Sequence, residues 1–160
     1  MSGQTQFITL GIGEEVFAIP IAEVQEILDL RPVSRLPHAP ASLVGLIDVR
    51  GGSVPVMDLR ALLGLSPIDP GPGTRILVLE VALPTQRLRL GLIVDQVFEV
   101  TGLDDAPVDA RPEIGRRWRS DCITGIGRRR GSFVILLDVA RLILADSAVL
   151  SAADGLTLAA

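Results

Sequence analysis

Residues 43–62 read LVGLIDVRGGSVPVMDLRAL, and residues 123–142 read ITGIGRRRGSFVILLDVARL. The two stretches share six identical residues at a constant spacing of 80, and several of the other positions pair one apolar residue with another. A second match, at a spacing of 73, relates residues 17–27 to residues 90–100. Because a difference in spacing only requires loops of different length, the chain is interpreted as two copies of one small module.

Short apolar runs rich in Val, Ile and Leu, separated by turn residues, are typical of β-strands. Ten strands are predicted: Gln6–Leu10, Val16–Ile19, Val24–Leu28, Leu43–Val49, Val54–Met57, Arg75–Val81, Leu88–Val94, Val97–Thr101, Ile123–Ile126 and Ser132–Leu137. Helical signal is confined to one turn at residues 20–23 and to two short helices, 59–63 and 138–146. Asp58 and Asp138 are suited to cap these two helices.

A module with five short strands fits a small closed barrel, because closure leaves no exposed strand edge. We therefore expect an all-β protein of two pseudo-symmetric five-stranded barrels with short connecting helices. The first barrel is expected at about residues 14–73 and the second at about 74–150, with the N-terminal strand able to pair with the second barrel. Residues 151–160 are expected to be a flexible tail. Since so small a barrel is only marginally stable alone, the two barrels should pack together and leave an apolar groove between them.

Composition excludes several classes of protein. The net charge is −4, which argues against a dedicated binder of nucleic acid or of an anionic membrane. The single Cys122 cannot form an internal disulfide, and the single His38 leaves no histidine-based metal site. No signal peptide, no apolar run of membrane-spanning length and no nucleotide-binding or hydrolase motif is present in the sequence. We expect a soluble intracellular protein with no catalytic residues, metal or cofactor.

The residues alone leave several alternatives open. Arg50 can be a solvated hairpin residue, and Glu26 can be exposed or can meet an arginine of a partner. A hydrolytic enzyme would need Asp58 and Asp138 within hydrogen-bonding range, although helix capping explains both. The arginine clusters 116–119 and 128–130 would suit a small nucleic-acid-binding barrel or a positive rim for protein contact.

Taken in order, the motifs resemble the CheW family of chemotaxis coupling proteins, over residues 5–150. The motifs that carry the resemblance are Phe17-Ala18-Ile19-Pro20-Ile21, Val24-Gln25-Glu26-Ile27, Leu36-Pro37, Pro40, Gly45, Val49-Arg50-Gly51, Val54-Pro55-Val56-Met57-Asp58-Leu59-Arg60, Gly91-Leu92-Ile93-Val94-Asp95-Gln96-Val97, Ile123-Thr124-Gly125-Ile126 and Leu136-Leu137-Asp138.

The resemblance implies one CheW-like domain over residues 1–160, built of two SH3-like barrels without catalytic activity. It implies two partners, the regulatory domain of a CheA-type histidine kinase and the cytoplasmic tip of a chemoreceptor, and a cytoplasmic location at receptor arrays without membrane insertion. By motif position, the family meets its receptor or kinase partners at Val24, Glu26, Ile27, Gly45 and Arg50. The family pattern and the repeat together place Val97 and Val100 along the groove between the barrels.

Overall fold

The structure, a computed structural model, describes residues 5–104 and 122–145. Each predicted strand overlaps one strand of the structure, and the predicted turn and helices are present. The elements are β1 (Phe7–Ile12), β2 (Glu15–Pro20), the 3-10 turn η1 (Ile21–Glu23), β3 (Val24–Asp29), β4 (Leu43–Val49), β5 (Gly52–Asp58), α1 (Leu59–Leu62), β6 (Arg75–Ala82), β7 (Arg87–Val94), β8 (Gln96–Thr101), β9 (Ile123–Arg129), β10 (Ser132–Leu137) and α2 (Val139–Ala145).

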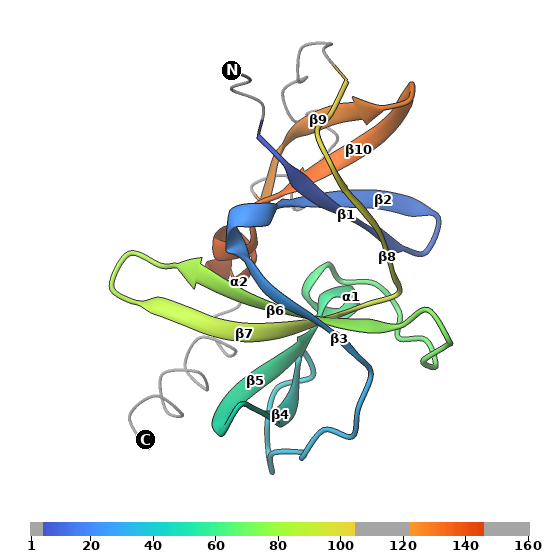
Figure 1. Cartoon of the computed structure of the whole chain (residues 1–160). Helices are drawn as coiled ribbons and strands as arrows, with labels where there is room; N and C mark the ends of the chain where they lie inside the picture. The colour runs from blue at the N-terminus through green and yellow to red at the C-terminus, as the bar shows by residue number, and fades with distance from the viewer. Residues whose placement is uncertain (1–4, 105–121, 146–160) are drawn as a thin grey trace.

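The strands form two five-stranded mixed sheets, so the expected all-β architecture is confirmed. The upper sheet of Figure 1 has the order β8-β1-β2-β10-β9, and the lower sheet has the order β3-β6-β7-β5-β4. Each sheet contains one parallel pair, β2 with β10 above and β5 with β7 below. The other neighbours in both sheets are antiparallel.

The sequence repeat relates the two sheets strand by strand. The spacing of 73 relates Ala18 to Gly91, and the spacing of 80 relates Val56 to Leu136. In the structure Ala18 pairs with Leu136, and Gly91 pairs with Val56. The two parallel pairs are therefore equivalent. Pairing also shifts by one residue at equivalent places, at Gln25 in β3 and at Phe98 in β8. The prediction of an internal duplication therefore extends to the pairing register.

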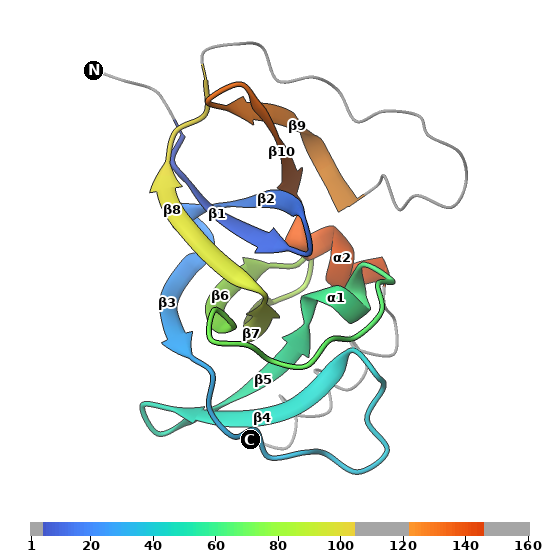
Figure 2. The same ribbon diagram turned by 90° about the vertical axis from the view of Figure 1, so that its right-hand side faces the viewer.

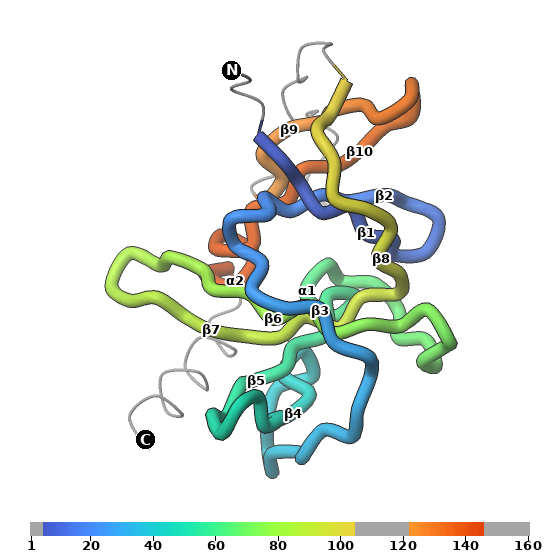
Figure 3. Tube along the Cα trace, viewed as in Figure 1, coloured from blue at the N-terminus to red at the C-terminus, as the bar shows by residue number. Residues whose placement is uncertain are grey.

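Strand pairing does not follow the expected division of the chain near residue 74. Strands β1 and β2 pair with β8–β10, and β6 and β7 pair with β3–β5. Only η1 separates β2 from β3, and only Asp95 separates β7 from β8, and at both places the chain continues into the other sheet. Figure 3 shows both crossings. Each sheet therefore combines two strands of one repeat with three strands of the other.

Backbone hydrogen bonds beyond the edge strands close each sheet into a small barrel. In the lower barrel, Ser34 and Leu46 exchange two N–H···O bonds of 2.8 Å. In the upper barrel, Asp104 N–H donates to the Arg128 carbonyl at 2.8 Å. Separate apolar clusters fill the two barrels, around Val56 in the lower one and around Ala18 in the upper one.

The largest apolar cluster lies between the barrels and includes residues of both sheets and of both α-helices. Leu59 and Leu62 of α1 and Leu142 and Ile143 of α2 are at most 1% exposed in it. The two helices lie on the face opposite to β3 and β8 (Figure 2). Each small barrel thus buries its outer apolar face against the other.

Candidate partner-binding site

Five of the predicted site residues lie on two equivalent strands, β3 and β8, which share one face of the molecule (Figures 1 and 2). Val24 of β3 and Val97 of β8 are partly buried against the shared core. Ile27 of β3 is 45% exposed and Val100 of β8 is 51% exposed. Each strand therefore exposes an apolar side chain and packs a valine against the core, and β8 also exposes Phe98.

The structure brings Glu26 and Arg50 together. A guanidinium nitrogen of Arg50 lies 3.5 Å from the Glu26 carboxylate, with the arginine side chain 80% exposed and the glutamate 28%. Arg50 lies in the β4–β5 turn with a positive φ of 54°, and the Asp48 carboxylate accepts the next backbone N–H, that of Gly51, at 2.9 Å. An ion pair this exposed contributes about 0–1 kcal/mol to stability, so its charges stay accessible to a partner.

Gly45 is buried in β4 and has a packing role. A Cβ atom at this position would lie 2.1 Å from the Ser34 carbonyl oxygen, which is far inside van der Waals contact. Its neighbour Leu46 forms the two bonds to Ser34 that close the lower barrel. Gly45 can therefore affect partner binding by positioning the segment around Ser34.

The expected apolar groove between the barrels is filled in its interior by side chains of this chain. Residues such as Leu10, Leu79 and Leu90 are fully buried in the shared core. The faces had to cover each other because neither barrel is large enough to bury them alone. A partner can reach the outer edge of the boundary between the two barrels, where β3 carries Ile27 and β8 carries Val100.

A second ion pair, in the upper barrel, is equivalent to the first. Arg129 Nε lies 3.6 Å from the Glu99 carboxylate, and the side chains are 31% and 40% exposed. Among the described residues this buried Nε has no hydrogen-bond partner. Neither residue alone indicates this pair, although the spacing of 73 that relates Glu26 to Glu99 could have found the acid. The spacing of 80 relates Arg50 to Arg130, whereas the arginine that pairs with Glu99 is the preceding residue, Arg129.

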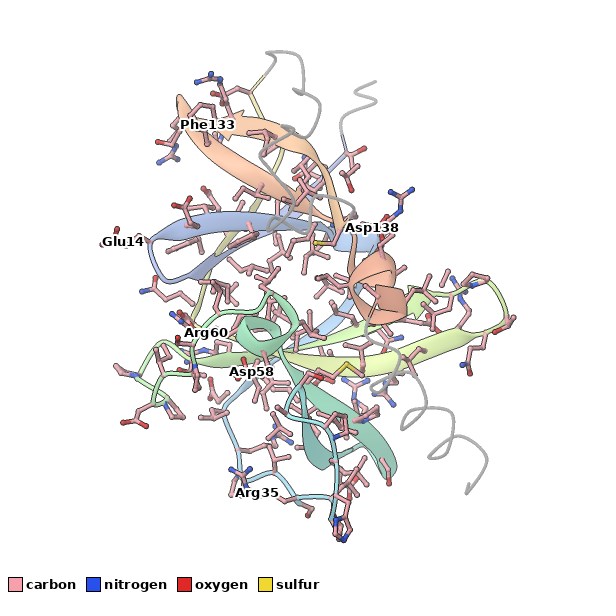
Figure 4. The ribbon with its side chains drawn as sticks, turned by 180° about the vertical axis from the view of Figure 1, so that it is seen from behind. Glu14, Arg35, Asp58, Arg60, Phe133 and Asp138 are labelled. Carbon is pink, nitrogen blue, oxygen red and sulfur yellow. The ribbon has the colours of Figure 1, made fainter. Side chains whose placement is uncertain are left out.

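The sequence analysis also missed a pocket at the end of the upper barrel. It has a volume of about 260 Å³ and is lined by Thr9, Val16, Phe98, Glu99, Arg129, Ser132, Phe133 and Val134. Phe98 and Phe133 are 52% and 58% exposed at its rim, and the Arg128 guanidinium stacks 4.4 Å from the Phe133 ring centre. Figure 4 shows Phe133 at this end of the molecule. The pocket is mainly apolar, and the Arg129–Glu99 ion pair forms its charged part.

Asp58 and Asp138 each cap their own helix, so the hypothesis of a hydrolytic carboxylate pair is wrong. The Asp58 carboxylate accepts the Arg60 backbone N–H at 3.0 Å, and the Asp138 carboxylate accepts the Arg141 backbone N–H at 3.1 Å. Figure 4 shows the two aspartates at separate helices. Burial raises the pKa of Asp58 against the opposing effect of its hydrogen bond to Arg60.

A partly buried ion pair connects the two barrels. The Arg60 guanidinium of α1 donates to the Asp95 carboxylate, with the shortest N···O distance 2.7 Å, and these side chains are only 14% and 19% exposed. Asp95 also accepts the Gly13 N–H of the β1–β2 turn at 2.8 Å. Burial acts to raise the pKa of Asp95, but the hydrogen bonds from Arg60 and Gly13 outweigh it and hold the pKa below its usual value.

The arginines of the β9–β10 turn are partly engaged within the chain. Arg128 stacks on Phe133 and Arg129 pairs with Glu99. The cluster at 116–119 lies outside the described residues. In the ranges 5–104 and 122–145, no group of three or more metal-ligating side chains occurs, and no helix is long and apolar enough to cross a membrane.

A family model described as a CheW-like domain matches residues 6–147. The chain belongs to the CheW family. Among its relatives, the probable chemotaxis protein CheW of Rhizobium etli is 36% identical over 112 residues, 70% of each chain. The chemotaxis protein CheW of Treponema pallidum is 29% identical over 139 residues, 87% of this chain and 82% of that one. Protein PilI of Pseudomonas aeruginosa is 36% identical over 104 residues, 64% of this chain and 53% of that one.

The fold agrees with a crystal structure of the scaffolding protein TtCheW from Thermoanaerobacter tengcongensis. The TM-score is 0.76 at 24% identity, over 88% of this chain and 92% of that one. This likeness supports the SH3-like two-barrel architecture of the CheW-family chain. The chain is thus a CheW-family chemotaxis scaffold protein and not an enzyme.

Proposed function

We propose that this CheW-family chain is a cytoplasmic adaptor that couples the cytoplasmic tip of a chemoreceptor to the regulatory domain of a CheA-type histidine kinase. An adaptor of this kind needs two separate contact surfaces on one rigid body, because both partners must be bound at the same time. The structure offers two candidate surfaces, one at β3 and β8 and one at the end of the upper barrel.

The face of β3 and β8 is the proposed contact for the receptor. The observation that carries this proposal is the exposed Glu26–Arg50 ion pair next to the outward Ile27 on an edge strand. An amphipathic receptor helix can cover Ile27 and Val100 while its own charges meet the pair. Charges at such a rim determine register and partner choice more than total affinity.

The end of the upper barrel is the proposed contact for the kinase regulatory domain. Its support is the pocket rimmed by Phe98 and Phe133, since aromatic side chains exposed together are typical of interaction sites. The pocket is lined by strands of the upper barrel and includes neither Glu26 nor Arg50. The two surfaces use different residues, although β8 contributes to both: Val100 belongs to the proposed receptor contact, and Phe98 and Glu99 belong to the pocket.

The test uses purified protein, a receptor-tip fragment and a kinase regulatory domain in calorimetric titrations. We expect the variant Glu26→Lys to bind the receptor fragment at least tenfold more weakly, which corresponds to about 1.4 kcal/mol. Its melting temperature should fall by less than about 4 °C, because the ion pair contributes at most about 1 kcal/mol. Glu14→Lys, in the exposed β1–β2 turn, makes the same charge change elsewhere and should leave binding unchanged.

The double variant Glu26→Lys with Arg50→Glu separates two roles of the pair. It retains the ion pair with its charges exchanged, so receptor binding would return if the pair served only to hold β3 against the turn. We expect binding to remain weak, since each charge is proposed to face the receptor. A folded wild-type protein that binds neither partner would refute the adaptor proposal, and unfolding of Glu26→Lys would give Glu26 a structural role instead.

A further inference from the structure

We propose that Arg60 and Asp95 are positioning residues for the receptor contact: they fix the start of β8 against the lower barrel and thereby set the spacing between Ile27 and Val100. They act without touching the receptor, since their side chains are mostly covered by this chain itself. This inference rests on the proposed adaptor function and adds the residues that align the two strands of the receptor face.

The two strands of the receptor face belong to different sheets. β3 pairs with β6 in the lower sheet, and β8 pairs with β1 in the upper sheet. Strand pairing therefore fixes each strand within its own sheet, and the spacing between Ile27 and Val100 depends on the contacts between the barrels. A receptor helix has to cover both side chains at once, and it binds more tightly when their spacing is set in advance.

The Asp95 carboxylate contacts both barrels. Arg60, in α1 directly after β5 of the lower sheet, donates to it from Nη2 at 2.7 Å and from Nε at 3.1 Å. Gly13, in the turn between β1 and β2 of the upper sheet, donates its backbone N–H to it at 2.8 Å. A two-nitrogen contact between arginine and carboxylate fixes orientation as well as distance. Because Asp95 is the residue between β7 and β8, this contact fixes the point at which β8 starts.

The segment that follows α1, residues 63–74, is attached to the same pair. A further nitrogen of Arg60, Nη1, donates to the Ser66 carbonyl at 3.0 Å. A Cβ atom at Gly73 would lie 3.2 Å from the Asp95 carbonyl oxygen, so the far end of the segment packs against the crossing. Figure 4 shows Arg60 beside α1, between the two barrels. The pair thus joins α1, this segment, the β1–β2 turn and the start of β8.

The equivalent crossing, at η1, is built differently. The spacing of 73 relates Asp95 to Ala22, and the spacing of 80 relates Arg60 to Ala140. Two alanines cannot form an ion pair, and around η1 the side chains of Ile21 and Ala140 pack against the shared core instead. Such apolar contacts are non-directional, whereas the bonds to Asp95 are directional. The orienting contact is therefore specific to the crossing that starts β8.

The first experiment measures the relative orientation of the two barrels in solution from amide residual dipolar couplings, fitted separately for each sheet. The variants are Arg60→Lys, which keeps the positive charge but loses the two-nitrogen contact, and Asp95→Asn, which removes the negative charge. We expect the orientation in both to differ from the wild type by more than the uncertainty of the fit. Asp29→Asn is the matched control and should keep the wild-type orientation, because Asp29 pairs with Arg75 at 3.4 Å within the lower sheet.

The second experiment titrates the same variants with the receptor-tip fragment and with the kinase regulatory domain. The receptor face spans both barrels, whereas the pocket proposed for the kinase is lined by the upper barrel alone. If the face is aligned for only about a tenth of the time, the receptor fragment binds about tenfold more weakly, and kinase-domain binding stays as in the wild type. Val56→Ala, at a fully buried position inside the lower barrel, lowers stability without changing the crossing and should retain receptor binding.

An unchanged orientation of the barrels in folded Arg60→Lys and Asp95→Asn would overturn the positioning role, and Arg60→Lys decides alone if Asp95→Asn does not fold. A changed orientation with unchanged receptor binding would overturn the effect on the receptor face. An equal loss of receptor binding in Val56→Ala, or of kinase-domain binding in the two variants, would do the same. A wild-type protein that binds no receptor fragment, together with a changed orientation in the variants, would refute the adaptor function and leave the positioning role intact.

Discussion

The substitution Gly45→Ala tests whether the closure of the lower barrel depends on the absence of a side chain. The added Cβ would lie 2.1 Å from the Ser34 carbonyl oxygen, 2.8 Å from the carbonyl carbon and 2.9 Å from a methyl group of Val33. Two of these three atoms are backbone, so the segment around Ser34 has to move away from β4. That movement breaks the two 2.8 Å bonds between Ser34 and Leu46.

The cost has two parts. Overpacking of a fixed site costs about 1–3 kcal/mol, and each lost backbone hydrogen bond costs about 0.5–1.5 kcal/mol. Together they predict a loss of about 4 kcal/mol in the free energy of unfolding, and a melting temperature lower by about 8–16 °C for a chain of this size. The measurement is urea unfolding at 25 °C together with a thermal scan.

Gly71→Ala is the matched control, because no described atom lies within 4 Å of a Cβ at that position. We expect its free energy of unfolding to change by less than about 0.5 kcal/mol. If Gly45→Ala costs less than about 1 kcal/mol, the reasoning is refuted, since the steric overlap would then be relieved without loss of the closure. Receptor binding by the folded fraction would show whether moving the Ser34 segment also disturbs the interface.

Two further substitutions test the carboxylates. Asp95→Asn should lower the free energy of unfolding at pH 7 by about 2–3 kcal/mol, because Arg60 and Gly13 lose a charged acceptor. Since the pKa of Asp95 is lowered, the contribution of this carboxylate is fully present at neutral pH, begins to fall near the ordinary pKa of about 4 and is lost as the pH falls through the lowered pKa, so the difference between variant and wild type should narrow steadily in that direction. A difference that stays constant as the pH is lowered below about 4 would contradict this explanation. Glu23→Gln should stabilise the protein at pH 7 by up to about 1 kcal/mol, because burial and the nearby Asp138 raise the pKa of Glu23 and the charged form is disfavoured. This gain should diminish as the pH falls through the raised pKa, and urea unfolding at pH 7 and pH 4.5 would reveal a constant gain if the reasoning is wrong.

Much of the fold was predictable because the signals are local or repeated. The strands follow from short Val-, Ile- and Leu-rich runs between turns, and the caps at Asp58 and Asp138 are visible as aspartates before short helices. The distribution of strands between the barrels was not predictable from the repeat. The chain changes from one sheet to the other at η1 and at Asp95, and no local sequence signal distinguishes these crossings from hairpin turns.

The candidate site was only partly accessible to sequence reasoning. The meeting of Glu26 and Arg50 requires the packing of β3 against the β4–β5 turn, and neither residue alone indicates it. The pocket at the upper end was missed because its lining residues come from five strands and are scattered from Thr9 to Val134.

The exchange of strands between the repeats has a consequence for how this architecture can be divided. A fragment ending near residue 73 would hold the opening hairpin of one barrel and the three remaining strands of the other, so it could complete neither. Each half of the chain needs strands of the other half to complete a barrel. Two fragments separated near residue 73 should therefore fold only when they associate with each other. Duplication has therefore produced two similar halves of the chain, neither of which contains all the strands of one barrel.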